Sequence, residues 1–479
     1  MKTVAALLLA AIGTMGALVG QSAPQAPDRS APPKPGPVAA LTLPQIQKRT
    51  LSNGLPVWVV ELHKVPVVHV TLVLKGGAAA DPPGKYGVSS LTAEMLDEGA
   101  GRRNALQIAD AVDYLGASLS TSSTSDATSI DLHVPVARLA DGLPIMADVA
   151  LRPTFPQEEL QRVREDLLTS IIQARDDPET LIQFAFPRLV YGPQHRYGTM
   201  TVGTAAAVKQ FSVADLRQFH TRQYVPSNAA LIVTGDVSTA SAVSRLETAF
   251  GSWKGTAVQP AVVPEAPQLT SRQVYLIDKP GAAQSQIRLG WIGVPRSTPD
   301  YFALRVLNTI LGGSFTSRLN QNLREEHGYA YGAGSTFDMR TGAGPFYAAA
   351  GVQTDKTSEA LTEFFKELEA IRKPIPAEEL EKAKNYLALL LPRNFETTQS
   401  LAGSLAQLFV YNLPADYYAT YTDRVRAVTP AAVQAAAERY IQPGKFAVVV
   451  VGDGTVVEPG IQALNLGPIK TVSIDEVMK

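Results

Sequence analysis

Apolar residues alternate with polar ones at every second position in two early segments of the chain. LSNGLPVWVV has this pattern after Asn53-Gly54, a dipeptide typical of hairpin turns, and VVHVTLVLKGG (Val67–Gly77) has it again. Two further alternating runs cover Ser118–Thr124 and Thr128–Val134. The pattern predicts four strands, all of them in the first half of the chain.

Helical spacing appears between and after these strands. In NALQIADAVDYLG, Asn104 is placed to cap a helix that Gly116 ends, and the apolar stripe of this helix comprises Ile108, Ala109, Val112 and Leu115. PQEELQRVREDLLTSIIQARDDP predicts a long helix with Pro156 in its first turn; the apolar face of this helix comprises Leu160, Val163, Leu167 and Ile171. Both helices therefore need a surface to pack on.

The stretch GVSSLTAEMLDEG, from Gly87 to Gly99, predicts an amphipathic helix that follows a glycine-rich strand exit and stops at a glycine. Val88, Leu91 and Met95 fall on one face, which we expect to pack on a sheet.

The chain also resembles itself. TRQYVPSNAALIVTGDVS and AERYIQPGKFAVVVVGDGT share a helix end, a Tyr, a Pro, a buried strand and a Gly-Asp pair, and Tyr440 follows Tyr224 by 440 − 224 = 216 residues. The offset predicts an α+β fold of two homologous domains, residues 45–251 and 272–467, each a mostly antiparallel sheet covered by helices. Residues 252–271 form a Pro-punctuated linker, and residues 468–479 are a tail.

The N-terminus predicts export. MKTVAALLLAAIGTMGALVGQSA (residues 1–23) has one Lys, a short apolar run and then small residues, which is typical of a signal peptide, and the run is too short to favour a permanent span. The Pro-rich residues 24–44 follow as a tether. The chain has no cysteine, which excludes disulfides and thiolate ligands and, together with export, suits a bacterial periplasm. We expect no integral membrane span after the signal is removed.

Composition narrows the list of partners. The 479 residues are 45% apolar, with 43 basic and 44 acidic residues and a net charge of −1. Single cores rarely grow beyond roughly 250 to 300 residues, so the length alone predicts more than one domain. No long run of one charge is present, and the chain therefore gives no electrostatic indication of nucleic acid or anionic lipid as a partner.

Several segments together resemble the pitrilysin/insulinase family of zinc metallopeptidases, and in particular its mitochondrial-processing-peptidase-like branch of two-domain chains. They are GG…DPPGKYG before the first helix, DDP after the long helix, YGPQHRYGTMTVGT, YVPSNAALIVTGDVS and LGGSFTSRLNQNLREEHGYAYG. The resemblance covers nearly the whole chain after the tether and implies a half-clamshell fold. In this family a first helix carries the inverted zinc motif HxxEH, and a second helix supplies a glutamate as the third ligand.

The resemblance places serine, alanine and glutamate where the family has its zinc chemistry. The first histidine falls on Ser90, the glutamate base on Ala93, the second histidine on Glu94, and the third ligand on Ser170 or, one place off, Thr169. Ser170 follows Glu94 by 170 − 94 = 76 residues, the spacing that the family requires, and we expect it on the inward stripe of its helix.

These residue types cannot replace the family's ligands. Zinc in proteins takes three ligands drawn from imidazole, thiolate and carboxylate, and one carboxylate among serines binds it weakly. Loss of the base would remove a further factor of about 10² to 10⁴. We expect no zinc and no other cofactor in this chain. Glu94, Asp97 and Glu98 could hold a hard cation through oxygen ligands, but we favour a solvated helix end because such sites usually need six or more oxygens.

The histidines offer no alternative site. His69 lies on the second predicted strand and is expected to be a satisfied, half-buried residue. The remaining ones show no HxxxH or HxxEH spacing and are expected to be structural or exposed: His63, His133, His195, His220 and His327.

The second half keeps a different set of functional residues. In SRLNQNLREEHGYAYGAGS, Arg324 closes a helix and Tyr331 opens a strand after the Gly328 turn. They match the Arg and Tyr with which the family grips the substrate backbone and supports the oxyanion, and both donate hydrogen bonds to a carbonyl oxygen. The alternatives are a surface ion pair of Arg324 with a neighbouring glutamate and a half-buried strand aromatic. Gly312 and Gly313 would either let a peptide backbone approach or break a helix that packs on the sheet.

The asymmetry between the two halves suggests a division of labour. In this family branch, two two-domain chains face each other, and in some members one chain carries the zinc while an inactive homologue contributes the Arg and Tyr. We expect a non-catalytic subunit of a heterodimeric periplasmic peptidase that binds peptide and places Arg324 and Tyr331 opposite a partner's zinc. The alternatives are a stand-alone metallopeptidase with atypical ligands and a metal-free structural or peptide-binding core protein.

Overall fold

The structure, a computed structural model, describes residues 43–479, which form one compact unit. The predicted leader and nearly all of the predicted tether lie outside these residues. None of the helices that the structure describes combines the length and the apolar character needed to cross a membrane.

The first half carries eight strands and eight helices among the described residues. Its strands are β1 (Gln47–Thr50), β2 (Pro56–Glu61), β3 (Val67–Lys75), β4 (Gly99–Ala100), β5 (Arg103–Asn104), β6 (Ser118–Ser123), β7 (Ala127–Pro135) and β8 (Ala229–Gly235). Its helices are α1 (Val88–Glu94), α2 (Ala105–Tyr114), α3 (Leu139–Leu151), α4 (Gln157–Gln173), α5 (Pro178–Tyr191), α6 (Ala205–Gln210), α7 (Val213–Gln223) and α8 (Thr239–Phe250).

The second half repeats this element order with few changes. Its strands are β9 (Gln273–Asp278), β10 (Gln284–Ile292), β11 (Ala330–Phe337), β12 (Pro345–Gln353), β13 (Ala447–Gly452) and β14 (Ile469–Thr471). Its helices are α9 (Tyr301–Leu311), α10 (Arg318–Asn320), α11 (Thr357–Ala370), α12 (Ala377–Leu390), α13 (Thr398–Val410), α14 (Tyr417–Arg426), α15 (Pro430–Tyr440), α16 (Gly454–Ala463) and α17 (Ile474–Met478). The predicted α+β fold with a repeat is confirmed.

Each half is built on one six-stranded sheet, in the order β1-β2-β8-β3-β7-β6 and β11-β12-β10-β13-β9-β14. Neighbouring strands are antiparallel except β2 with β8, β9 with β13 and β9 with β14, which are parallel. The two sheets therefore share a plan in which the late strand of the repeat, β8 or β13, inserts into the middle of the sheet. β6 and β11 are the corresponding edge strands.

Most of the predicted elements are confirmed, with small corrections. Gly54, at φ +86°, closes the hairpin between β1 and β2, and Asn104 caps α2 in a capping box. Ala109, predicted on the inner stripe of α2, is exposed instead, because the buried positions of this short helix are confined to one narrow line that includes Ile108 and Val112.

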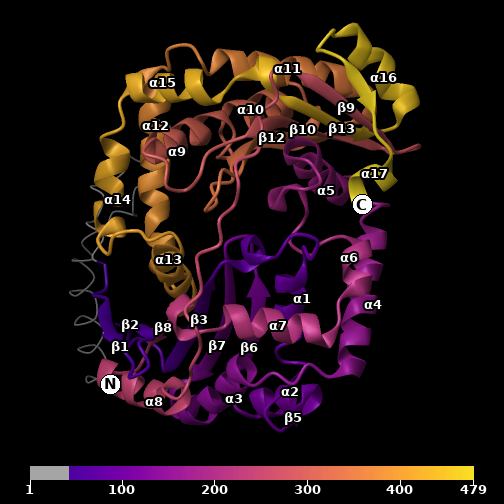
Figure 1. The fold of residues 1–479 in the computed structure, drawn as a ribbon. Coiled ribbons are helices and arrows are strands. Elements are labelled where there is room, and N and C mark those ends of the chain that lie inside the picture. The colour runs from indigo at the N-terminus through magenta and orange to yellow at the C-terminus, as the bar shows by residue number, and fades with distance from the viewer. Residues whose placement is uncertain (1–42) are drawn as a thin grey trace, which may run out of the picture. The chain divides into compact units, whose positions relative to one another are not determined.

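Each half packs one of its helices on the sheet of the other half. Leu181, Ile182 and Phe186 of α5 pack on the face of the second sheet formed by β10 and β13, and residues of α13 such as Leu401 and Leu405 pack on the first sheet at β3 and β8 (Figure 1). Each sheet is thereby covered on both faces, once by helices of its own half and once by a helix of the other. This reciprocal packing explains why residues 43–479 form a single unit although their sequence is a repeat.

The linker and the tail are both ordered parts of this unit. In the linker region, Trp253 is buried and its indole N–H donates to the carbonyl oxygen of Tyr224 at 3.2 Å. In the tail, β14 extends the second sheet beside β9, and α17 contacts α5 with Val477 and Met478 buried. The sequence pattern did not predict these last two elements, because they are too short to show a period.

Histidine burial predicts a pH dependence of stability. His220 on α7 donates from Nε2 to the carbonyl oxygen of Ala150 at 2.9 Å and stacks on Tyr224 with ring centroids 4.4 Å apart. Burial lowers the pKa of His220 below its usual 6.5. The unfolded chain therefore binds more protons below about pH 6.5, and stability falls as the pH decreases through this range.

We expect His220→Gln to reduce this loss of stability, measured as the difference in urea midpoint between pH 7.5 and pH 5.5. His63→Gln is the matched control with the opposite sign, because hydrogen bonds to Asp236 and Glu61 raise the pKa of His63. An identical pH dependence in wild type and His220→Gln would contradict the prediction.

Candidate functional site

The helix α1 is fixed at its N-terminus by a buried carboxylate. Asp81 accepts hydrogen bonds from the backbone N–H groups of Gly87 at 2.7 Å and Ser89 at 2.9 Å, which are free donors at the start of a helix. Gly87 itself has φ +106°, and a Cβ there would lie 2.5 Å from the carbonyl oxygen of Val202. The segment DPPGKYG thus ends in a glycine because only glycine fits between the helix and residue 202.

The same carboxylate forms a buried ion pair with Arg196. Nη2 of Arg196 lies 2.9 Å from Asp81, and the two side chains are 6% and 0% exposed. Burial raises the pKa of Asp81, while Arg196 and the two backbone donors oppose this rise. The guanidinium also donates to the carbonyl oxygens of Ala78 and Thr199. One arginine therefore joins the strand exit, the start of α1 and the segment after residue 196.

The helix α1 is shorter and more deeply buried than the sequence predicted. It spans Val88–Glu94 rather than the whole stretch to Gly99, which instead begins the short strand β4. Val88, Leu91 and Met95 pack in the core as expected. Residues on the opposite side are buried as well, because α7 and β6 also contact the helix. The helix is therefore not amphipathic in its environment.

The degenerate zinc positions, which are Ser90, Ala93, Glu94 and Ser170, do not form a metal site. Ser90 is 5% exposed and donates its hydroxyl to the carbonyl oxygen of Thr201 at 2.9 Å. Ala93 is 1% exposed and has no side-chain donor. Glu94 is exposed, although the surrounding protein raises its pKa by desolvation. Glu94 is the only carboxylate among these positions.

The predicted inward position of Ser170 is wrong. Ser170 is exposed, and its hydroxyl donates to the carbonyl oxygen of Asp166 one turn earlier on α4. The buried stripe of α4 is confirmed at Leu160, Val163, Leu167 and Ile171. At about 100° per residue, Ser170 lies roughly 65° away from the middle of this stripe, which places it at the margin of the buried face.

Zinc, the metal that the family resemblance implies, does not fit these side chains. Both serine hydroxyls are bound to backbone carbonyls, alanine has no donor atom, and a single glutamate remains. Among residues 43–479 there is no group of three or more His, Asp or Glu side chains that could hold a metal ion. The acidic alternative is weakened further, because Glu98 pairs with Arg162 at 2.5 Å.

The histidines have other partners. His69 is buried on β3 within 3.3 Å of Asp131, opposite His133 on β7. His195 stacks on Tyr191 with ring centroids 5.0 Å apart, and His327 stacks on Tyr329 at the same separation. The prediction of a satisfied, half-buried His69 is wrong, because His69 is buried and its Nδ1 has no hydrogen-bond partner among residues 43–479.

In the second half, Arg324 and Tyr331 lie face to face. The guanidinium carbon of Arg324 lies 5.0 Å from the centroid of the Tyr331 ring and 4.7 Å from that of Phe315, so the cation is in contact range of two aromatic rings. Tyr331 is 86% exposed and Phe315 is 63% exposed. Arg324 also lies 3.2 Å from Glu325. Both the predicted pair and the alternative ion pair are therefore present.

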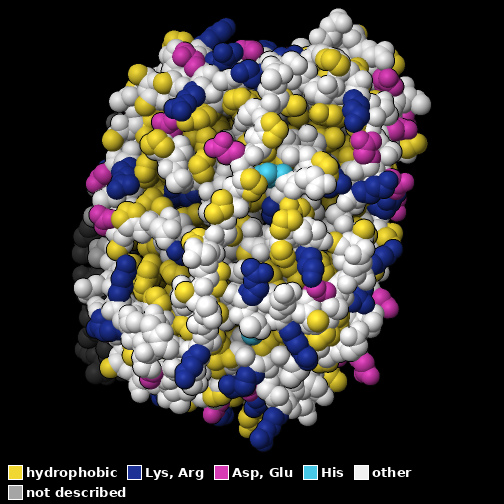
Figure 2. Space-filling model, viewed as in Figure 1, with side chains coloured by type: hydrophobic (Ala, Val, Ile, Leu, Met, Phe, Trp, Pro, Cys, Tyr) yellow, Lys and Arg dark blue, Asp and Glu magenta, His cyan; other side chains and the backbone are white. Residues whose placement is uncertain are grey.

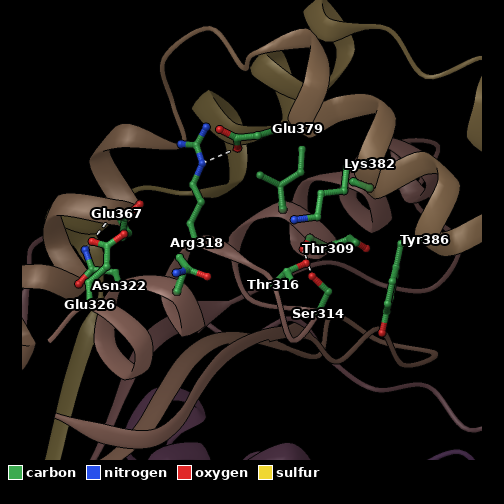
Figure 3. A pocket seen from close by; sticks show the side chains of 13 residues that line it. Thr309, Ser314, Thr316, Arg318, Asn322, Glu326, Glu367, Glu379, Lys382 and Tyr386 are labelled. Carbon is green, nitrogen blue, oxygen red and sulfur yellow. Dashed lines mark hydrogen bonds and ion pairs between the residues drawn. The ribbon is translucent and has the colours of Figure 1, made fainter. Parts of the chain in front are cut away.

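The segment that carries Arg324 is a π-helical turn, Gln321–Glu326, anchored from below. Asn322 donates to Glu363 at 2.8 Å and Glu367 at 2.9 Å, both on α11, and Arg318 donates to Glu379 on α12 at 2.8 Å. All of these side chains except Glu363 line a pocket of about 390 Å³ (Figure 3). The anchors hold the turn in place and leave the guanidinium of Arg324 on the outside.

The predicted turn at Gly328 is confirmed at φ +65°, whereas Gly312 and Gly313 follow the packing alternative. A Cβ at Gly312 would lie 2.2 Å from the backbone nitrogen of Ser335, and one at Gly313 would lie 2.6 Å from the side chain of Asn308. The end of α9 thus approaches β11 as closely as glycine permits. This approach brings Phe315 beside Arg324.

Several residues of the site escaped the sequence analysis. Asp81 and Arg196 lie in segments that carried the resemblance, but nothing in the sequence pairs them across 115 residues (196 − 81). Phe315, Asn322 and Arg318 likewise showed no period or motif of their own. On the face shown in Figure 2, Lys and Arg side chains are spread among acidic and uncharged ones, in keeping with the balanced charge of the chain.

Comparison with known proteins follows this division into halves. A family model described as Insulinase (Peptidase family M16) matches residues 57–193, and one described as Peptidase M16 inactive domain matches residues 210–387. A Bacillus subtilis protein described as uncharacterized zinc protease YmxG is 26% identical over 358 residues, covering 74% of this chain and 86% of the relative. A Mycobacterium tuberculosis protein described as uncharacterized zinc protease Rv2782c is 29% identical over 322 residues, covering 65% and 71%.

Solved structures share the whole fold. The Pseudomonas fluorescens structure described as a peptidase M16 inactive domain has a TM-score of 0.78 at 25% identity and covers 85% of this chain and 98% of its own. A protease from Helicobacter pylori has a TM-score of 0.79 at 22% identity, covering 85% and 100%. A chain of complex III from Candida albicans has a TM-score of 0.72 at 15% identity, covering 86% and 97%. At such identities the last two indicate the fold alone.

Proposed function

The chain belongs to the insulinase family of M16 peptidases, and we propose that it acts there as the non-catalytic subunit of a heterodimeric periplasmic peptidase. In this proposal it binds peptide substrate and contributes Arg324 and Tyr331 to an active site whose zinc is held by a homologous partner chain. The relatives described as zinc proteases support peptide hydrolysis as the chemistry of the complex.

One observation carries the proposal, namely the asymmetry between the two halves. At the zinc positions the first half has two serine hydroxyls that already donate to backbone carbonyl oxygens, the methyl group of an alanine, and one glutamate. The second half presents Arg324 beside two exposed aromatic rings, on a turn that two carboxylates hold through Asn322. A chain that had lost all function would have no need to hold an arginine in this way.

The retained pair suits the support of a carbonyl group. Arg324 offers a planar fork of N–H donors, and Tyr331 offers a phenolic O–H, so both can donate to an oxygen that gains negative charge during attack on a peptide bond. Phe315 stacks on the guanidinium and restricts its orientation. Nε of Arg324 lies 3.2 Å from Glu325, so the proposal assigns the donation to the carbonyl oxygen to the two terminal nitrogens of the fork.

The test is reconstitution. A zinc-bearing homologue with HxxEH should be mixed with this chain, and cleavage of a fluorogenic peptide followed against each protein alone. We expect cleavage only, or far faster, in the mixture. Glu94→Gln is the matched control, and it should leave the stimulation unchanged because the proposal gives this carboxylate no role. Absence of any stimulation would overturn the proposal.

Two other functions are distinguished by simple measurements. A stand-alone metallopeptidase would retain one tightly bound zinc per chain after purification, which metal analysis detects. A metal-free core protein of a membrane assembly has the structural similarity to complex III in its favour. It would copurify with membrane subunits, whereas the proposed subunit would be released from the periplasm with its homologous partner.

A further inference from the structure

A second cavity, of about 560 Å³, lies where the two halves meet. The first half contributes Val73 of β3 and residues of the β6–β7 hairpin, and the second half contributes α9, α13 and the end of β11 with the residues that follow it. This volume falls in the range of small-ligand sites. The cavity is separate from both Arg324 and the degenerate zinc positions, none of which line it.

Two arginines without a carboxylate partner line this cavity. Arg296 is 9% exposed, stacks on Tyr301 with its guanidinium carbon 3.6 Å from the ring centroid, and donates to the Tyr417 hydroxyl at 2.7 Å. Arg305, on α9, has a fully buried Nε that meets no acceptor among residues 43–479. Within the described part of the chain, neither guanidinium has an acidic side chain within 4.0 Å.

The acidic residues at the cavity are already satisfied. Asp126 accepts from the backbone N–H of Thr341 and from the Tyr411 hydroxyl, both at 2.9 Å. Asp338 accepts from Arg340 at 2.9 Å and 2.5 Å. The lining thus holds two arginines and two aspartates. Because both aspartates are already bound by other donors, the two guanidinium groups line the cavity without a carboxylate partner, and an incoming anion would supply one.

Part of the rest of the lining is apolar. Val73, Phe337, Met339 and Val410 line the cavity together with the two arginines. A simple inorganic anion would satisfy the charge and leave this apolar surface in contact with water. A carboxylate with an apolar group beside it matches both parts of the lining, because an arginine fork binds a carboxylate in a bidentate manner and the apolar group is removed from water.

We propose that this cavity binds a carboxylate ligand with an adjacent apolar side chain, and that the ligand is the C-terminal residue of a peptide. The carboxylate lies between Arg296 and Arg305, and the side chain packs against Phe337 and Val410. The choice of a peptide rests on the proposed function, whereas the choice of a carboxylate rests on the cavity alone. Bound in this way, a peptide end would bridge the two halves of the chain.

The test compares Ala-Ala-Ala-Ala-Leu as the free acid and as the C-terminal amide, binding to the full chain in titration calorimetry. We expect the acid to bind about tenfold or more tightly than the amide, which lacks the charge-assisted hydrogen bonds. This comparison on the wild-type protein needs no variant. Equal affinity for the two peptides would overturn the proposal, and sodium acetate that competes as well as the acid would reduce the ligand to the anion alone and overturn its peptide part.

Substitutions of single arginines test where on the protein the peptide carboxylate binds. Arg305→Gln should lower the affinity of the acid to that of the amide, while Arg138→Gln, at an exposed arginine outside the cavity, should leave the ratio unchanged. An unchanged ratio in Arg305→Gln would place the carboxylate elsewhere and overturn the proposal. If only the reconstitution assay failed, the proposed subunit function would be refuted. The ratio of the two peptide affinities would not be affected by that result.

Discussion

Replacing Arg324 by alanine should abolish most of the peptide cleavage that this chain adds to a zinc-bearing partner. Removal of one oxyanion donor typically costs about 10² to 10³ in kcat, and Arg324 combines such a donor with a full positive charge. Arg324→Lys keeps the charge and loses the fork, so we expect it to restore only a small part. The measurement is kcat of the reconstituted complex at saturating subunit concentration, which separates catalysis from assembly.

Glu325→Gln is the decisive control for this prediction. If the contact of Arg324 with Glu325 were the reason for the arginine, its removal would be as damaging as Arg324→Ala. Exposed pairs of this kind contribute about 0.2 to 1 kcal/mol, and breaking one frees the guanidinium for substrate. We therefore expect full or slightly higher activity in Glu325→Gln. Equal losses in both variants would reduce Arg324 to a structural residue.

Replacing Tyr331 tests the other member of the pair independently of Arg324. At 86% exposure its ring contributes little to the core, so Tyr331→Phe should leave stability within about 0.5 kcal/mol of wild type. The same variant removes the phenolic donor while keeping the ring that stacks on Arg324. Lower kcat with an unchanged unfolding curve would therefore assign a chemical role to the hydroxyl itself.

The sequence predicted the repeat, four strands of the first half and the helices α1, α2 and α4 because these depend on local patterns. The stripe of α4 and the cap at Asn104 are periodic or positional signals that a short window contains. The exchange of α5 and α13 between the halves has no such signal, since each helix shows only that one face is apolar and not which sheet covers it. Ser170 shows the same limit, because a margin position is decided by neighbours on other elements.

Only some residues of the candidate site could be predicted from the sequence. Arg324 and Tyr331 were found because a motif with fixed spacing names them. Phe315 was missed, although it stacks on the same guanidinium, because the close approach of Gly312 to β11 brings it there. The two arginines of the second cavity come from a loop and a helix and meet residues of the other half, a contact that only the folded chain creates.

Replacing Asp81 by alanine should produce the largest loss of stability. The variant leaves the Arg196 guanidinium buried without its anion and leaves the N–H groups of Gly87 and Ser89 without an acceptor. Breaking a buried ion pair by removing one partner costs about 3 to 5 kcal/mol. Loss of the helix cap adds about 1 kcal/mol. The measurement is the urea midpoint followed by the tryptophan fluorescence, to which Trp58 in the first half and Trp253 in the linker contribute together with Trp291 in the second half.

Asp141→Asn is the matched control, because Asp141 forms an exposed pair with Arg138 at 3.6 Å and its loss should change stability by no more than about 1 kcal/mol. The variant Asp81→Asn should fall between the two, since an amide oxygen can still accept one backbone hydrogen bond but carries no charge. If Asp81→Ala lost less than about 1 kcal/mol, the pair could not be what holds α1 against the segment after Arg196. The degenerate helix would then owe its position to core packing by Leu91 and Met95 alone, and its retention would need no special contact at its start.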